Sequence, residues 1–144
     1  MTSLAIHELQ TQKEILDAFP IMCQLRTHLH QKNYLHLVTE AKEKDMYKMF
    51  ALSENGRIVA VTGFKPMITL YYGRFVWVCD LVTDKHKRSH GYGDTLLTYV
   101  HKWARENNYE NVALSSGLQR TSAHNFYEEK MGYKKASYVF KKTI

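Results

Sequence analysis

Apolar residues recur at helical spacing in four stretches of the chain. Residues 11–29 carry the first pattern, and Pro20 predicts a kink or a restart within it. The second pattern covers residues 33–43, and the third is the amphipathic run LLTYVHKWA that follows RSHGYG. The fourth, TSAHNFYEEKM, ends at Gly132. These stretches are predicted to be helices.

Strand patterns fill the spaces between these helices. Residues 4–9 predict a short first strand, and MYKMFALS with IVAVTGFKPMITLYY predicts a hairpin that turns at Asn55 and Gly56. Gly73 separates this hairpin from RFVWVCDLV, whose nearly unbroken apolar run is typical of a strand buried on both faces. NVALSS and ASYVFKK predict the last two strands. The order of elements predicts an α/β (mixed α+β) sheet in a single domain over residues 1–144.

The amino-acid composition is typical of a globular protein. The 144 residues are 44% hydrophobic and 24% charged, which suffices for one buried core. No apolar run approaches the roughly 20 residues that span a bilayer, so no membrane association is expected. The first residues, MTSLAIHELQ, do not resemble a secretory signal. Cys23 and Cys79 are predicted to be free core thiols, and we expect a cytoplasmic protein.

The net charge and the histidines limit the kinds of metal site and binding partner that are expected. The 8 histidines form no HExxH motif and there is no C-x-x-C pair, so no metal site is expected. The net charge of +6 is compatible with nucleic acid, with an anionic cofactor or with no specific partner. Lys85, Lys87 and Arg88 crowd the RSHGYG turn. A second basic group flanks the last predicted strand, and there we expect a solvated face.

The RSHGYG segment is the first candidate binding site. Gly91 and Gly93 lie between a predicted buried strand and an amphipathic helix. A glycine-rich turn at that point leaves backbone N–H groups unpaired at the positive end of the helix dipole, which suits phosphate. Taken alone, the segment is equally compatible with an ordinary glycine-containing turn.

Two motifs in this half of the chain resemble a known family. DLVTDKHKRSHGYGDTLL is similar, without a gap, to the R/Q-x-x-G-x-G/A signature of the GNAT superfamily of N-acetyltransferases. AHNFYEEKMGY resembles the second motif of that family, A-x-x-F-Y-E-x-x-G-F/Y, with Gly132 one residue later than the commonest spacing. The pattern S-x-x-x-x-R-x-x-A-H-x-F-Y is also similar to small bacterial members such as the aminoalkylphosphonate N-acetyltransferases.

The resemblance covers essentially the full chain and implies the GNAT fold. That fold is a single central mixed, mostly antiparallel sheet flanked by about four helices. It also implies acetyl-CoA as co-substrate, with pantetheine along the strand before the loop and pyrophosphate at the loop. The implied cofactor-binding residues are Leu81, Val82, Thr83, Arg88, Ser89, His90, Gly91, Tyr92, Gly93, Asp94, Arg120 and Ala123. Arg120 stands where many members have asparagine, Lys85 where proline is frequent, and Ser89 where glycine is common.

The resemblance assigns catalytic roles to two residues. Tyr127 matches a tyrosine that serves as general acid for the leaving CoA sulfur; the alternative is a core tyrosine packed on its own helix. Asp80 matches an acidic residue that often acts as general base, directly or through water. A carboxylate that anchors the ammonium of the substrate, or one that supports a loop, remains an alternative. Cys79 has no obvious activating partner, so no covalent intermediate is expected.

The predicted function is therefore acetyl-CoA-dependent N-acetylation of a primary amine, with direct attack in a ternary complex. A small polar amine is the expected acceptor and a protein lysine or N-terminus the alternative. A non-catalytic acyl-CoA sensor or nucleic-acid-binding module is the alternative of another class, although we expect no nucleic-acid partner. We expect a monomer or homodimer. Candidate acceptor contacts are aromatic and basic: Arg26, His28, His30, Tyr34, His36, Tyr71, Tyr72 and Arg74.

Overall fold

A computed structural model describes residues 3–144, and the chain divides into two compact units. The first ends at Ala113 and the second comprises Leu114–Ile144. The first unit contains the hairpin, most of the predicted helices and the RSHGYG turn. The second contains the AHNFYEEKMGY motif and the last residues of the chain.

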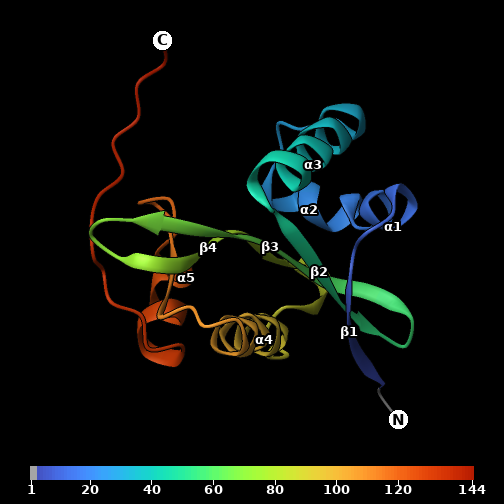
Figure 1. The fold of residues 1–144 in the computed structure, drawn as a ribbon. Coiled ribbons are helices and arrows are strands. Elements are labelled where there is room, and N and C mark those ends of the chain that lie inside the picture. The colour runs from blue at the N-terminus through green and yellow to red at the C-terminus, as the bar shows by residue number, and fades with distance from the viewer. Residues whose placement is uncertain (1–2) are drawn as a thin grey trace. The chain divides into compact units, whose positions relative to one another are not determined.

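The sheet follows the chain order from β1 to β5, and Figure 1 labels the first four of these strands. Each neighbouring pair from β1 to β4 is antiparallel. The predicted hairpin is confirmed, since Asn55 and Gly56 have φ angles of 52° and 82°, as a tight turn between twisted strands requires. The strands are β1 (Leu4–Glu8), β2 (Lys48–Glu54), β3 (Arg57–Thr69), β4 (Gly73–Thr83) and β5 (Asn111–Leu114).

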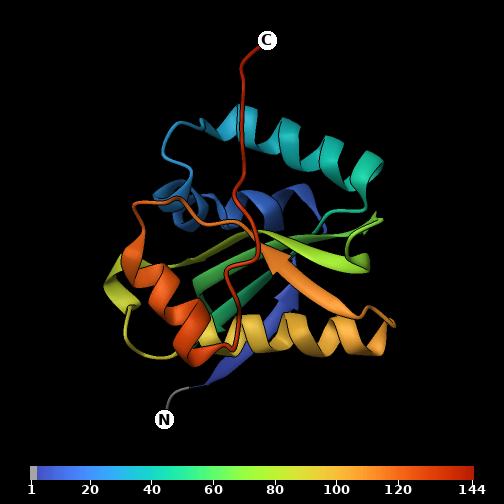
Figure 2. The same ribbon diagram turned by 90° about the vertical axis from the view of Figure 1, so that its left-hand side faces the viewer.

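Helices cover both faces of the sheet in the first unit. α1 (Gln12–Asp17), α2 (Phe19–Leu25) and α3 (Gln31–Asp45) lie on one face and α4 (Tyr92–Glu106) on the other (Figures 1 and 2). The predicted break at Pro20 is confirmed, because α1 ends at Asp17 and the proline occupies the first turn of α2. Thr11 begins α1 with a capping box to Glu14.

The two faces of the sheet have different cores. Aliphatic and aromatic side chains such as Ile15, Tyr34 and Val61 fill the space beneath α1–α3. Under α4 the core is aromatic: the Phe64 ring lies 5.6 Å from that of Phe50 and 4.9 Å from that of Trp103. These cores fix the sheet that carries the candidate site.

One residue interrupts the pairing of β3 with β4. Gly63 lies opposite Asp80, but the next residue, Phe64, lies opposite Val78, so Cys79 is extra in its strand. Such a bulge turns the following side chains and recurs beside active sites. Here it governs the direction of Asp80.

The second unit is built around one short helix. α5 (Thr121–Asn125) continues as a π-helical turn, η2 (Phe126–Lys130), in which Met131 N–H donates to the Phe126 carbonyl at 3.2 Å. A π-helical turn holds one residue more than a regular α-helical turn. It therefore accommodates the extra residue that separates Tyr127 from Gly132 in this sequence.

The final strand predicted from ASYVFKK is wrong for this structure. Among the described residues, the sheet ends at β5, and residues 132–144 form neither helix nor strand. Alternating apolar residues favour a strand, but a strand exists only where a neighbour accepts and donates its backbone hydrogen bonds. This segment has the pattern without such a neighbour.

Candidate active site

The loop that follows β4 is anchored to α2 at its beginning. Asp84 Oδ1 accepts hydrogen bonds from His86 N–H at 3.2 Å and from Gln24 Nε2 at 3.3 Å. Lys85 N–H donates to Gln24 Oε1 at 2.8 Å. These contacts fix the short 3₁₀ turn η1 (Lys85–Lys87), and with it the point at which the RSHGYG segment leaves the sheet.

The end of the loop has the geometry of an anion site. Gly91 precedes α4 with a φ of 78°, a left-handed conformation that glycine adopts without strain. Gly91 is the N-cap residue of α4 and has no side chain that could accept from the first N–H groups of the helix. Those groups point out of the positive end of a 15-residue helix. The predicted phosphate seat is therefore compatible with the backbone present at Gly91, Tyr92 and Gly93.

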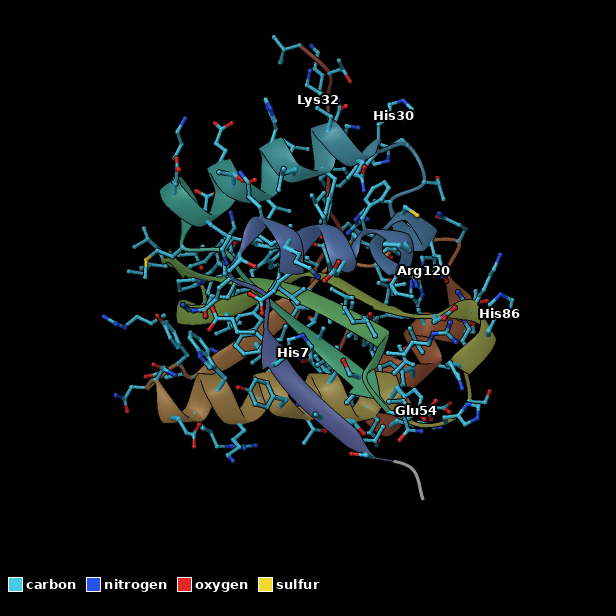
Figure 3. All side chains as sticks on the ribbon, turned by 90° about the vertical axis from the view of Figure 1, so that its right-hand side faces the viewer. His7, His30, Lys32, Glu54, His86 and Arg120 are labelled. Carbon is cyan, nitrogen blue, oxygen red and sulfur yellow. The ribbon has the colours of Figure 1, made fainter. Side chains whose placement is uncertain are left out.

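Side chains of the loop turn toward the protein and brace it. The Tyr92 side chain is buried, and its hydroxyl donates to the Glu54 carboxylate at the end of β2. Lys87 Nζ lies 2.8 Å from Glu54 Oε1. His90 stacks on Tyr92 with ring centroids 5.5 Å apart. Glu54 lies at the same end of this unit as His86 of the loop (Figure 3), so one carboxylate ties two points of the loop to the sheet.

Two of the predicted cofactor residues have their rings engaged within the protein. The Tyr92 hydroxyl donates to Glu54, and the His90 ring stacks on that of Tyr92, so the predicted contact would involve their backbone groups. Arg88, Ser89 and Asp94 are exposed on the outside of the loop. The brace by Glu54 was not predicted, because its two partners lie more than thirty residues further along the sequence.

The last residues of β4 offer a backbone edge. Leu81, Val82 and Thr83 pair with β3 on one side. On the other side β5 begins beside the start of β4, where Glu110 N–H donates to the Arg74 carbonyl at 3.3 Å. Because both strands advance by a similar rise per residue, the four residues of β5 end before Asp80. The predicted pantetheine edge at Leu81–Thr83 therefore lies beyond the end of β5.

Asp80 is the centre of a charged network at the bulge. Its Oδ1 accepts from Arg26 Nε at 2.9 Å, and its Oδ2 accepts from the Tyr47 hydroxyl at 2.7 Å. Arg26 Nη2 also donates to the Cys79 carbonyl at 2.8 Å. The Asp80 side chain is 15% exposed and that of Arg26 39%. Both carboxylate oxygens thus have a donor, and Arg26 still faces solvent.

Burial controls the protonation of two neighbours of Asp80. Burial, and then the Asp80 charge, raise the pKa of Tyr47 well above its ordinary value, so this phenol remains a hydrogen-bond donor. The same two causes raise the pKa of the Cys79 thiol to about 12. Cys79 is therefore a thiol at neutral pH and a poor nucleophile.

Tyr127, Arg120 and Ala123 belong to the second unit. Tyr127 lies at the π-helical turn, with its ring 5.3 Å from that of Phe126 and 5.9 Å from that of Tyr133. Arg120 precedes α5 and is exposed, and Ala123 lies within that helix. His124 Nε2 lies 2.8 Å from the Gly117 carbonyl oxygen. The AHNFYEEKMGY motif thus begins within α5, includes all of η2 and ends three residues after it.

The predicted acceptor contacts do not gather in one place. Tyr34 is wrong as an acceptor contact, because it is buried and its hydroxyl donates to the Ile15 carbonyl at 2.6 Å. Arg26 contacts Asp80, whereas Arg74 lies at the opposite end of β4. His30 lies at the outer start of α3 (Figure 3). Tyr47 contacts Asp80 as well, and the sequence analysis missed it.

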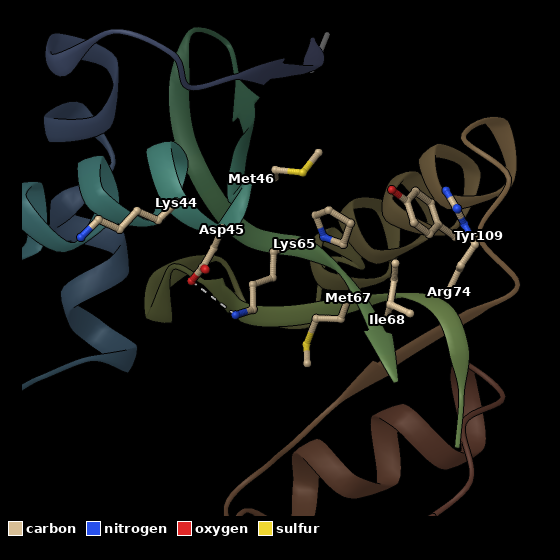
Figure 4. A pocket seen from close by; sticks show the side chains of 9 residues that line it. Lys44, Asp45, Met46, Lys65, Met67, Ile68, Arg74 and Tyr109 are labelled. Carbon is tan, nitrogen blue, oxygen red and sulfur yellow. Dashed lines mark hydrogen bonds and ion pairs between the residues drawn. The ribbon is translucent and has the colours of Figure 1, made fainter. Parts of the chain in front are cut away.

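The pocket near Arg74 is separate from this network. Its volume is about 550 Å³, and Lys65 crosses it to reach Asp45 at 3.5 Å (Figure 4). Arg74 lies over the Tyr109 ring at its rim, 5.9 Å from the centroid. Neither Asp80 nor any residue of the loop lines it, so the site chemistry lies elsewhere.

Within residues 3–144, no group of three or more histidine, cysteine, aspartate or glutamate side chains is placed to hold a metal ion. No helix in the same range has the length and apolar character needed to cross a membrane.

Comparison with known proteins decides the family. The model of the Acetyltransferase (GNAT) family matches residues 10–133. The chain belongs to the GNAT family. An uncharacterized N-acetyltransferase of Bacillus subtilis (strain 168), YhdJ, is 42% identical over 137 residues, which are 95% of this chain and 96% of that one. This GNAT protein is accordingly an acyltransferase that uses acetyl-CoA as co-substrate.

Solved structures confirm the GNAT fold. The aminoglycoside N-acetyltransferase AAC(6')-Iy, solved in complex with CoA, superposes with a TM-score of 0.87 at 13% identity over 100% of this chain and 96% of that one. A transcriptional regulator from Bacillus halodurans C-125 gives a TM-score of 0.85 at 19% identity over 99% and 100% of the two chains. At these identities the likeness concerns the fold alone.

Proposed function

We propose that this GNAT enzyme transfers the acetyl group of acetyl-CoA to the primary amine of a small polar molecule. The observation that carries the proposal is the Asp80 network at the end of β4, directly before the loop with free N–H groups. In this proposal the Asp80 carboxylate binds the amine and the loop before α4 binds the phosphates of acetyl-CoA, so both substrates lie at the same end of β4. In this proposal both units act as one catalytic domain over residues 1–144.

Asp80 acts in this proposal as the anchor of the acceptor amine. Arg26 and Tyr47 each hold one oxygen of its carboxylate, which fixes the direction in which the carboxylate faces the acceptor. Each carboxylate oxygen has a second lone pair, however, and can still accept from an ammonium. Arg26 and Tyr47 are positioning residues that hold the carboxylate toward the acceptor.

The partly exposed guanidinium of Arg26 supports a small polar acceptor. Two of its five N–H donors are used, one by Asp80 and one by the Cys79 carbonyl. The remaining donors suit an acidic group carried by the same molecule as the amine. An acceptor with both groups would therefore satisfy Asp80 and Arg26 together.

The reaction needs no covalent enzyme intermediate in this proposal. The ammonium held by Asp80 first loses one proton to water. The neutral amine then attacks the thioester carbonyl, the new amide bond forms, and the C–S bond breaks. The nitrogen loses its second proton to water, and Tyr127 donates a hydrogen bond to the departing CoA sulfur, or a proton that it regains from water. The raised pKa of Cys79 supports direct attack, because its thiol does not compete as a nucleophile.

The experiment is a thiol-release assay with acetyl-CoA and a panel of amines. The panel contains alkylamines, amino acids of matched chain length and a lysine peptide. We expect CoA release with small amines and faster release when the amine also carries an acid group. Release with the peptide alone would favour a protein acetyltransferase, and acetyl-CoA binding without release from any amine would favour a sensor.

Asp80→Asn tests the anchoring role. We expect the KM for the amine to rise by about tenfold or more, as for loss of a charged hydrogen bond, with the KM for acetyl-CoA unchanged. Steady-state kinetics in both substrates over a range of pH measures this. A kcat that falls sharply and recovers as pH rises toward the pKa of the amine would instead establish Asp80 as the general base.

A further inference from the structure

A pocket lies beside the part of β3 that extends beyond β2 (Figure 4). β2 begins at Lys48, opposite Phe64, whereas β3 continues to Thr69. Met46, with a φ of 60°, turns the chain from the end of α3 toward β2. Among the described residues, no strand therefore lies on that side of residues 65–69. The opening has a volume of about 550 Å³, which is within the range of small-molecule sites.

Apolar side chains form most of the wall of this pocket. Met46, Pro66 and Ile68 are among them, and Met46 and Ile68 are 63% and 73% exposed. Methionine adapts its shape to the group that packs against it, and exposed apolar side chains around a hollow are characteristic of a ligand site. The wall therefore suits a ligand with an apolar body.

Arg74 is held at one side of the pocket by two contacts. Its guanidinium lies over the Tyr109 ring, 5.9 Å from the centroid, and that ring stacks on Trp103 with centroids 5.8 Å apart. Its backbone carbonyl accepts from Glu110 N–H at 3.3 Å. Stacking leaves the N–H donors of a guanidinium available, and their planar fork matches the two oxygens of a carboxylate. The pocket therefore presents an oriented cation to a ligand.

The other two cations of the pocket already have acidic partners. Lys65 Nζ lies 3.5 Å from Asp45 Oδ2. Lys44 Nζ lies 2.9 Å from Glu40 Oε2. Arg74 lies on the side of the pocket opposite the Lys65–Asp45 pair (Figure 4), and no carboxylate of the described chain forms an ion pair with it. The charge that a ligand could balance is therefore that of Arg74.

We propose that this pocket binds a small monocarboxylic acid with an apolar body, such as an arylalkyl or medium-chain alkyl acid. The carboxylate pairs with the guanidinium fork of Arg74. The apolar body lies against Met46, Pro66 and Ile68, from which it displaces water. One negative charge and one apolar group are the two features that the pocket recognises.

This site is distinct from the Asp80 network. Arg74 precedes Asp80 by six residues in β4, one of which is the bulge residue Cys79. At the rise of an extended strand, the two residues lie roughly 17–20 Å apart. A small acid held at Arg74 is too short to reach Asp80. The inference therefore does not depend on the identity of the acceptor or on the roles of Asp80 and Tyr127.

An extended peptide is the competing occupant, because strands can add to a free side of β3. Pro66 lies in the centre of that side and has no backbone N–H. Proline at an edge protects a sheet from the addition of another strand. The unpaired charge of Arg74 also favours a ligand with an anionic group over a neutral backbone.

Titration with phenylpropionate, and separately with octanoate, tests the site. Amide NMR spectra of the isotope-labelled full chain locate the bound acid. We expect saturable shifts at Met46, Lys65, Ile68 and Arg74, with a dissociation constant of about 1 mM or below for at least one acid. Phenylpropanol, which has a similar body without the charge, should bind at least about tenfold more weakly than phenylpropionate.

Arg74→Gln removes the proposed anion contact and should weaken the binding of the preferred acid by at least about tenfold. Arg57→Gln is the matched control, because it makes the same change of charge at an exposed position at the other end of β3. Its dissociation constant should stay within about twofold of the wild-type value, since exposed charges at that distance are screened.

The proposal is overturned if neither acid gives saturable shifts at up to about 10 mM. Equal binding by wild type and Arg74→Gln, or equal binding of acid and alcohol, would also contradict it. Shifts confined to the loop before α4 or to Asp80 would mean that the acid occupies the acetyl-CoA or acceptor site. If a capped peptide of alternating threonine and valine shifted the pocket residues and the acids did not, strand addition would replace the proposal.

Discussion

Asp80 owes its position to residues that lie far from it in the sequence. Arg26 comes from the end of α2, and Tyr47 from the segment between α3 and β2. Gly63, opposite Asp80 in β3, makes room for the tyrosine. A Cβ at Gly63 would lie 1.7 Å from the Tyr47 hydroxyl oxygen, which is an impossible contact. The absence of a side chain at Gly63 is therefore a condition for the network.

Gly63→Ala should displace Tyr47 and destabilise the fold by about 1–3 kcal/mol, the usual cost of overpacking. Urea unfolding measures the loss. The matched control repeats the substitution in a Tyr47→Ala background, by comparing Tyr47→Ala with Tyr47→Ala/Gly63→Ala. In that background the tyrosine ring that would collide with the new Cβ is absent. If Gly63→Ala costs as much in the Tyr47→Ala background as in the wild type, the steric explanation is wrong.

Tyr127→Phe should lower kcat by about 100-fold and leave the KM for acetyl-CoA within about twofold, as expected for a group that acts on the leaving sulfur. Tyr133→Phe is the control, because its ring neighbours that of Tyr127. Burial raises the pKa of Tyr133, so it stays protonated in this range of pH. Equal rates for wild type and Tyr127→Phe would exclude Tyr127 from the chemistry.

At the scale of elements, the loop between β4 and α4 depends on Glu54 at the end of β2. The loop, its glycines and the helix that follows were predictable from the sequence, because strand, turn and helix patterns are local. Glu54 and Tyr47 were not predicted, and Arg26 was predicted without its bond to Asp80, because these contacts form only when the sheet brings distant segments together. The strand predicted from ASYVFKK is wrong for the opposite reason, since its local pattern is that of a strand but no strand of the described residues pairs with it.

Glu54 should make stability depend on pH in the acid range. Lys87 and Tyr92 lower the pKa of Glu54 from its ordinary value of 4.5. The unfolded chain therefore binds a proton at Glu54 more readily than the folded chain does. The contribution of Glu54 to the free energy of unfolding is present above its ordinary pKa and is lost as pH falls through its lowered pKa in the folded state. Urea unfolding from about pH 7 to about pH 3 should show a smaller loss of stability for Glu54→Gln than for the wild type.

The control for this experiment is Glu43→Gln, on the exposed side of α3. Its acid-side loss of stability should resemble that of the wild type. If Glu54→Gln loses as much stability as the wild type over this range, Glu54 does not brace the loop through its charge.

At the scale of the whole molecule, the protein has a net charge of +6, whereas its co-substrate acetyl-CoA is an anion. The KM for acetyl-CoA should rise by about two- to fivefold as salt increases from about 50 to about 300 mM, because exposed charges are screened. Arg88→Gln should reduce this dependence, whereas Lys13→Gln, an equal change of charge on α1, should not. Equal salt dependence in both variants would show that only total charge matters.

The π-helical turn between Tyr127 and Gly132 has a consequence for how relatives are found. The additional residue is absorbed within the helix, and Gly132 still ends it with a φ of 75° at a longer interval from Tyr127. A motif search that demands one fixed interval would pass over this chain. A search that permits one optional position there would recover it, along with any homologue in which the same lengthening has occurred.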